Sequence, residues 1–148
     1  DTMEEFADTM STFKEELSSA SSTSNKSSFA LFLATYKIHH ILFKSRAYSA
    51  VVNGIAKDGL KKDHMHCGFG VWYYGTGMNL FKNNNIFKAM EAEHISFHAL
   101  INSNIECAIE GGCMTKNDKK DQIMKDFQTA EENSNKLFNL LDELSEDI

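Results

Sequence analysis

No proline interrupts the 148 residues of this chain. Proline lacks a backbone N–H and clashes with the preceding helical turn, so a chain without it is free to form long helices. Apolar residues recur at intervals of three and four positions, which is the spacing of one helix face. Because 42% of the residues are hydrophobic, the chain can bury one core. We therefore predict an all-α fold, in the form of a four-helix bundle.

Two helices are expected in the C-terminal half. The first runs from about Ile86 to Glu110, with Asn85 as its cap and Gly111-Gly112 at its end, and the second covers residues 117–146. The apolar spacing also predicts which residues of each helix face the core. These are Phe87, Met90, His94, Phe97, His98, Ile101 and Ile105 on the first helix, and Ile123, Phe127, Ala130, Ser134, Leu137, Leu141 and Leu144 on the second.

A third helix, from Phe29 to about Lys57, is apolar on two sides. A helix with two apolar faces must be covered on both, and a symmetric dimer is the commonest way to cover the outer one. We therefore expect a homodimer. One face holds Phe29, Leu33, Tyr36, His40, Phe43, Ala47 and Ala50, and the other holds Leu31, Ala34, Ile38, Ile41, Tyr48 and Val52.

The first 27 residues are interpreted as a helical linker or stalk, and residues 28–148 as the bundle domain. Serine dominates residues 18–28, which form either a hinge or a poorly packed continuation of the helix. Ser27 or Ser28 could cap the helix that follows. Before this segment the apolar residues are spaced as in a coiled coil or an ordinary amphipathic surface helix, at Met3, Phe6, Met10, Phe13 and Leu17.

Residues 58–85 are expected to be an irregular, aromatic-rich segment. Glycines at positions 68, 70, 75 and 77 suggest tight turns around bulky rings. They do not indicate a phosphate-binding loop, because no Lys-Ser or Lys-Thr follows them. The rings are Phe69, Trp72, Tyr73, Tyr74 and Phe81.

Charge and hydropathy exclude two classes of partner. The formal net charge is −6 with no basic stripe, which argues against nucleic acid. No apolar run approaches the roughly 20 residues of a membrane-spanning helix. The chain starts at Asp1, so we expect a fragment whose targeting information lies elsewhere. Three widely spaced cysteines do not describe a disulfide framework, so we expect reduced thiols and a cytoplasmic location.

Four residues form a candidate metal site. His94 and His98 are four apart on an apolar helix face, so their imidazoles can reach one metal ion. His40 lies on the inner face of the earlier helix, and Cys67 begins the aromatic segment. Each alone has an ordinary alternative, a hydrogen-bonded core histidine or a buried thiol. Together they are the tetrahedral nitrogen and sulfur set that zinc prefers, with no position left for a reacting water.

The sequence also resembles a known family, the chemoreceptor zinc-binding domain. The resemblance rests on KIHHILFKSRAYS at 37–49, HMHCGFGVWYYGTG at 64–77 and HISFH at 94–98, in that order. It implies that the zinc ligands are His40, Cys67, His94 and His98. His64 matches a common position that is not a ligand. His39 is an extra neighbour of His40, and His66, Cys107 and Cys113 have no assigned role.

The resemblance implies a dimeric sensory domain in the cytoplasm, attached to a bacterial chemotaxis receptor or, less often, to a diguanylate cyclase. The expected input is zinc or an oxidant such as hypochlorous acid, which would act on Cys67 as a zinc-bound thiolate. A structural zinc bundle used only for dimerisation is the main alternative. We do not expect an enzyme, because Glu91 and His94 lack the second Glu-x-x-His pair of a diiron site.

Overall fold

The computed structural model describes the backbone of residues 2–148 and the side chains of residues 8–57 and 59–148. Three long helices dominate it: α1 (Thr2–Asn53), α4 (Asn85–Glu110) and α5 (Asn117–Glu146). Between α1 and α4 lie a short turn, η1 (Asp58–Leu60), and three short helical pieces, α2 (Gly68–Trp72), η2 (Tyr73–Gly77) and α3 (Met78–Phe81). The all-α bundle predicted from sequence is confirmed.

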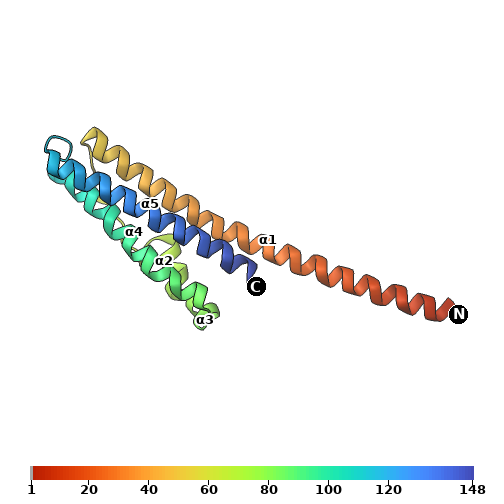
Figure 1. Cartoon of the computed structure of the whole chain (residues 1–148). Coiled ribbons are helices and arrows are strands. Elements are labelled where there is room, and N and C mark those ends of the chain that lie inside the picture. Colours follow the sequence, from red (N-terminus) through yellow and green to blue (C-terminus); the bar gives the residue numbers. More distant parts are fainter. Residues whose placement is uncertain (1) are drawn as a thin grey trace.

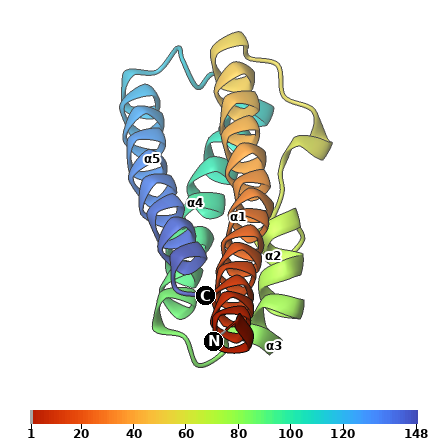
Figure 2. The ribbon, with the colours of Figure 1, turned by 90° about the vertical axis from the view of Figure 1, so that its right-hand side faces the viewer.

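The long helices pack side by side, and the α2–α3 segment adds a fourth helical layer (Figures 1 and 2). Helix α1 contacts both α4 and α5 along its C-terminal half. Its N-terminal half projects beyond the bundle as a single long helix (Figure 1). Helix α5 ends beside α1 where Lys26 Nζ donates a hydrogen bond to the Glu146 carbonyl at 3.2 Å. None of the described helices is long and apolar enough to cross a membrane.

The core is made by the faces that the apolar spacing predicts. Every residue expected on the inner face of α4 is buried, and so is every one on α5 except the partly buried Phe127. On α1 the predicted inner face is buried from Leu33 to Ala50, with Phe43 half-buried. The opposite face of α1 stays exposed, as a helix with two apolar faces requires. Its large residues are Leu31, Ile38, Ile41, Tyr48 and Val52.

The serine-rich segment continues the helix. The sequence left open either a hinge or a poorly packed continuation of the helix, and in the structure α1 continues through the segment. The predicted cap at Ser27 or Ser28 is therefore wrong. The segment has no glycine or proline to stop a helix, and hydroxyls bond back to the preceding turn, as Thr23 does to the Ser19 carbonyl at 3.0 Å. Met3 and Phe6 of the predicted stalk lie outside the described side chains.

The prediction of an irregular segment over residues 58–85 is wrong for residues 68–81, which are helical. The aromatic rings explain this, because their spacing of three and four lets a helix bury them together. Tyr73 stacks on Phe87 with ring centroids 4.1 Å apart, and Trp72 meets the same ring edge-on at 5.9 Å. The cap of α4 is also one residue earlier than predicted, since the Asn84 side chain accepts from the Phe87 N–H at 3.0 Å.

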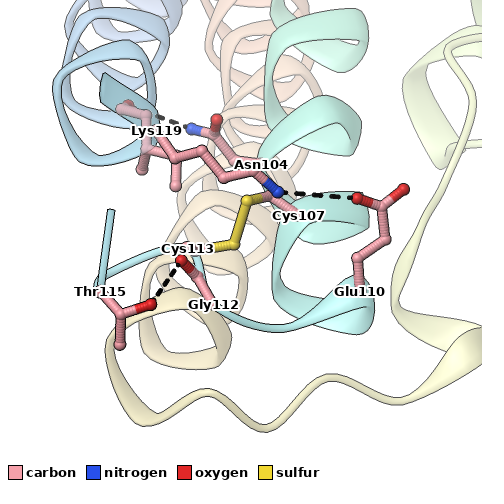
Figure 3. Close-up of a disulfide and its surroundings, with 8 residues drawn as sticks. Asn104, Cys107, Glu110, Gly112, Cys113, Thr115 and Lys119 are labelled. Carbon is pink, nitrogen blue, oxygen red and sulfur yellow. Dashed lines mark hydrogen bonds and ion pairs between the residues drawn. A yellow bond between two sulfur atoms is a disulfide. The ribbon is translucent and has the colours of Figure 1, made fainter. Parts of the chain in front are cut away.

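The expectation that all cysteines are reduced is wrong for two of them. Cys107 and Cys113 form a disulfide across the α4–α5 turn (Figure 3). Gly111 and Gly112, with φ of 82° and 77°, turn the chain back sharply enough for Cys113 to reach the last turns of α4. Cys113 is buried against Ala50 and Val51, at the C-terminal end of α1. The bond thus closes a short loop at one end of the bundle.

Cys113→Ser should lower the free energy of unfolding by on the order of 2 kcal/mol, because a disulfide around a short loop restricts the unfolded chain by about that amount. Urea titration followed by circular dichroism measures the change. The matched control is a phosphine reductant, after which the variant and the unmodified protein should unfold at similar urea concentrations. In the unreduced, denatured protein only Cys67 should react with maleimide, and three reactive thiols would contradict the pairing.

Candidate metal centre

Three separate elements bring the four predicted ligands together. His40 comes from the C-terminal half of α1, and His94 and His98 lie one turn apart on α4. Cys67 is the residue that caps α2. All four side chains are buried, and their candidate ligand atoms all lie within 4.8 Å of one another. No single element could make this arrangement, so the centre joins α1, α4 and the α2 segment.

Backbone carbonyls orient two of the imidazoles. His40 Nδ1 lies 2.7 Å from the Tyr36 carbonyl oxygen, and His98 Nδ1 lies 2.7 Å from that of Lys62. Each Nδ1 therefore carries the proton, and each Nε2 presents a bare lone pair to the centre. Those two Nε2 atoms are buried and have no hydrogen-bond partner. A buried acceptor without a partner is unfavourable by about 1–3 kcal/mol, and a bound cation removes both penalties at once.

Cys67 completes the set. Its Sγ lies 3.2 Å from His94 Nε2 and accepts a hydrogen bond from the Gly70 N–H, also at 3.2 Å. Asp63 shapes the turn before it by accepting from the backbone N–H groups of Met65 at 2.9 Å and His66 at 3.0 Å. Three imidazole nitrogens and one sulfur thus face a common point, the donor set of a four-coordinate zinc site.

Residues 40–105 match the family model of the chemoreceptor zinc-binding domain. This segment of the chain is similar to that family. The matched segment begins at His40 and contains the other three residues of the cluster. The zinc cofactor predicted from sequence is confirmed by the family and by a cluster suited to a metal ion. A search of curated proteins and a search of solved structures found no match.

Burial sets the charge state of the zinc-binding domain's centre. Burial, assisted by the neighbouring histidines, lowers the pKa of His94 to about 2 and that of His98 to about 4. Burial also lowers the pKa of His40. The three imidazoles are therefore neutral at pH 7, which is the form that binds metal. Burial raises the pKa of the Cys67 thiol, although the backbone N–H groups of Gly70 and Phe69 and the nearby Lys62 charge oppose this, so a bound cation would have to displace the thiol proton.

The remaining histidines stand outside the cluster. His39 and His66 are exposed, and the His66 ring pairs with Asp63 at 2.8 Å. His64 is half-buried, with its ring centroid 6.1 Å from that of His94. Among the described side chains, only His40, Cys67, His94 and His98 converge in this way. The separation of His40 from its neighbour His39 is what the helix spacing predicts, because the two point to different faces.

Several supporting groups were not predicted from the sequence. The Lys62 carbonyl that orients His98 is itself fixed by Asn102, whose side chain donates to the Lys62 carbonyl at 2.9 Å and accepts from its N–H at 3.1 Å. Asn102 follows His98 by one helical turn, so its spacing was a usable signal. The contribution of the Tyr36 and Lys62 carbonyls carries no sequence signal, because every residue has a carbonyl.

Gly70 is also required for a steric reason. A Cβ at this position would lie 1.8 Å from the His64 carbonyl oxygen, whereas a Cβ at Gly59 would meet nothing within 4 Å. The absence of a side chain at Gly70 therefore allows the turn that carries Cys67 to lie directly on α2. A larger residue must push that turn, and Cys67 with it, away from the histidines.

Gly70→Ala should weaken zinc binding by about ten- to a hundred-fold, the usual effect of displacing a group that positions a metal ligand. Competition with a chromophoric chelator measures the affinity. Gly59→Ala is the matched control and should bind zinc normally. Alanine is the better helix former, so an unchanged affinity with a more stable fold in Gly70→Ala would show that the contact is not restrictive.

Proposed function

We propose that this zinc-binding domain is the sensory domain of a bacterial chemotaxis receptor, in which His40, Cys67, His94 and His98 hold the zinc ion. The observation that carries the proposal is the convergence of four donors from three elements, two of them bare Nε2 atoms. Such a centre fixes the packing of those elements while it is intact. A change at the centre can therefore alter the packing of the helices, which is the requirement for a sensor.

The input is zinc or an oxidant, and Cys67 is the group on which an oxidant acts. Bound zinc would keep Cys67 as a thiolate, which is the oxidisable form. Hypochlorous acid would transfer its oxygen to the sulfur, giving a sulfenic acid and releasing chloride. The sulfur loses two electrons, which the chlorine takes up. The neutral product is a poorer metal ligand and a weaker acceptor for the Gly70 N–H.

Release of Cys67 would alter the packing on α1 through the aromatic rings of α2. Phe69 and Trp72 follow Cys67 closely and pack on Tyr36, with ring centroids 5.6 Å and 5.9 Å away. Tyr36 also provides the carbonyl that orients His40. A displaced α2 therefore removes both a packing surface and the support of one ligand from the same turn of α1.

The dimer is the second part of the proposal, and its support is a continuous stripe on α1. Residues with the same heptad spacing run along the whole helix, through the stalk and onto the outer face of the bundle. A stripe of this period is typical of the seam of a parallel two-stranded coiled coil. We therefore propose that a second copy of this chain packs on it. The stripe consists of Met10, Phe13, Leu17, Ala20, Ser24, Ser27, Leu31, Ala34, Ile38, Ile41, Ser45, Tyr48 and Val52; all but the half-buried Ala34 are exposed.

In this arrangement α1 connects the centre to a signalling domain of the same chain, either the chemotaxis receptor domain or, as the alternative, a diguanylate cyclase. The location would be cytoplasmic. In that compartment a disulfide such as Cys107–Cys113 is usually a transient, redox-active one. The exposed stripe also supports a different function, a zinc bundle that serves only to hold a dimer together.

The sensory function is tested by metal content and by a brief pulse of substoichiometric hypochlorous acid. About one zinc per chain is expected, falling sharply in His94→Ala and unchanged in the matched control His66→Ala. Mass spectrometry should find Cys67 oxidised, and proteolysis should cut residues 64–81 faster. Zinc without any oxidant response would favour the structural bundle, and protein without zinc would exclude the proposed site.

Ile41→Glu should convert the dimer to a monomer that still binds one zinc, because the charge falls on the seam while Ile41 is 46% exposed and outside the core. Light scattering at tens of micromolar measures the mass. Ser22→Glu places the same charge on the side of α1 away from the stripe and should remain a dimer. A monomeric unmodified protein would contradict the assignment of the stripe.

A further inference from the structure

A cleft of about 580 Å³ opens beside the metal centre, between α1 and the chain that precedes α2. Three residues of the cluster, His40, Cys67 and His98, contribute to its lining. Its volume lies within the usual range of small-molecule sites, about 300–1,000 Å³. The cleft is therefore a route by which a small molecule can reach the Cys67 sulfur from solvent.

The charge of this cleft differs from that of the rest of the chain. The chain has a formal net charge of −6, yet none of the described side chains that line the cleft is a carboxylate. Arg46, Lys62 and His39 line it instead. Arg46 is the only arginine of the sequence. A concave surface with one sign of charge concentrates ions of the opposite sign.

The two permanent cations of the cleft are not neutralised by neighbours. Neither the Arg46 guanidinium nor the Lys62 ammonium forms an ion pair with any side chain described in the structure, although Lys37, Lys44 and Lys61 all do. A guanidinium presents a rigid fork of donors that matches the two oxygens of a small oxyanion. These groups are free to take a ligand from solvent.

Dimerisation would leave this cleft open. In the heptad pattern of α1, His39 and Arg46 occupy equivalent positions seven residues apart, each one residue beyond a seam residue, Ile38 and Ser45. That position points away from a partner helix in a two-stranded coiled coil. Leu42, which also lines the cleft, flanks the seam, so the cleft lies beside the face that a second copy would cover and not on it.

We propose that this cleft binds small oxyanions and holds them beside the Cys67 sulfur. Arg46 and Lys62 supply the charge, and His39 lines the mouth. The proposal rests on the proposed function only in taking Cys67 as the responsive group of the sensor. It adds a selectivity to that group, since an anion would be concentrated at the sulfur whereas a neutral molecule of the same size would not.

Two alkylating reagents of nearly the same size test the proposal on the zinc-loaded protein. Iodoacetate is an anion and iodoacetamide is neutral, and in both cases the Cys67 sulfur forms a bond to the methylene carbon while iodide leaves. Arg46→Gln should slow the iodoacetate reaction by about three- to ten-fold, the effect of removing one nearby charge, and leave the iodoacetamide rate unchanged. Lys62→Gln should slow iodoacetate more than iodoacetamide, because the Lys62 charge also favours the Cys67 thiolate. Mass spectrometry of the Cys67 peptide gives both rates.

Lys88→Gln removes one unpaired surface charge from α4 away from the cleft and is the matched control. Arg46→Lys keeps the charge and should retain most of the iodoacetate rate. In the unmodified protein, added salt should slow the reaction with iodoacetate but not that with iodoacetamide. This comparison does not depend on the folding of any variant. Parallel changes in both rates, or the same loss in Lys88→Gln, would overturn the proposal.

If the zinc-bound sulfur reacts with neither reagent, reversible binding decides the question. The fluorine resonance of trifluoroacetate should be broad with the unmodified protein and sharper with Arg46→Gln. The resonance of the neutral trifluoroethanol should stay sharp with both proteins. Equal trifluoroacetate line widths for the two proteins would exclude the site. Zinc content is measured on every sample. If the protein lacks zinc but still prefers the anionic reagent, the proposed sensory function fails and the anion site stands. If the protein holds zinc but shows no preference for the anionic reagent, the proposed anion site fails.

Discussion

The hydrogen bonds from His40 and His98 to backbone carbonyls are the contacts on which the centre depends. Each fixes the tautomer of its ring and turns a bare Nε2 inward, where the structure offers no donor. The resulting penalty of about 1–3 kcal/mol per nitrogen is small beside the roughly 10–16 kcal/mol of a structural zinc site. A bound cation would supply the partner that these two nitrogens lack, so the cluster is suited to be completed by one.

The rings around the cluster reinforce this dependence. Phe69, Phe97 and Phe43 lie against the imidazoles, with ring centroids 4.7 Å from His94, 5.3 Å from His40 and 5.1 Å from His98. Their presence keeps water from the nitrogens and strengthens electrostatic interactions inside. The site also links two regions of the core, since Phe69 belongs to the region around α2 and Phe97 to the one among α1, α4 and α5.

The sequence predicts those parts of the molecule that depend on spacing along one element. Apolar periodicity identifies the inner faces of α4 and α5, and a separation of four places His94 beside His98. It fails where the outcome depends on contacts between elements. Glycines suggested an irregular chain over residues 68–81, whereas rings packed across α1 and α4 make it helical. The Cys107–Cys113 bond depends on a turn with two positive φ values, and the Lys62 carbonyl is invisible to any residue pattern.

Helix α1 links the chemistry of the centre to the proposed dimer because the same turns serve both. His40 points into the bundle, and Ile41, its neighbour in sequence, lies on the exposed stripe. A change in ligand geometry that rotates or shifts this turn must move the seam with it, because a helix is rigid over this distance. The stripe contains only small residues at Ala20, Ser24 and Ser27, between larger ones on either side. In the proposed dimer, a seam packed by small side chains would be held more weakly than its neighbours, so a shift that starts at the centre would meet least resistance there. The serine-rich part of α1 has a continuous helical backbone. In the proposed dimer it would be weakly packed, and the two ends of the helix could then adopt different spacings from the partner without breaking the helix.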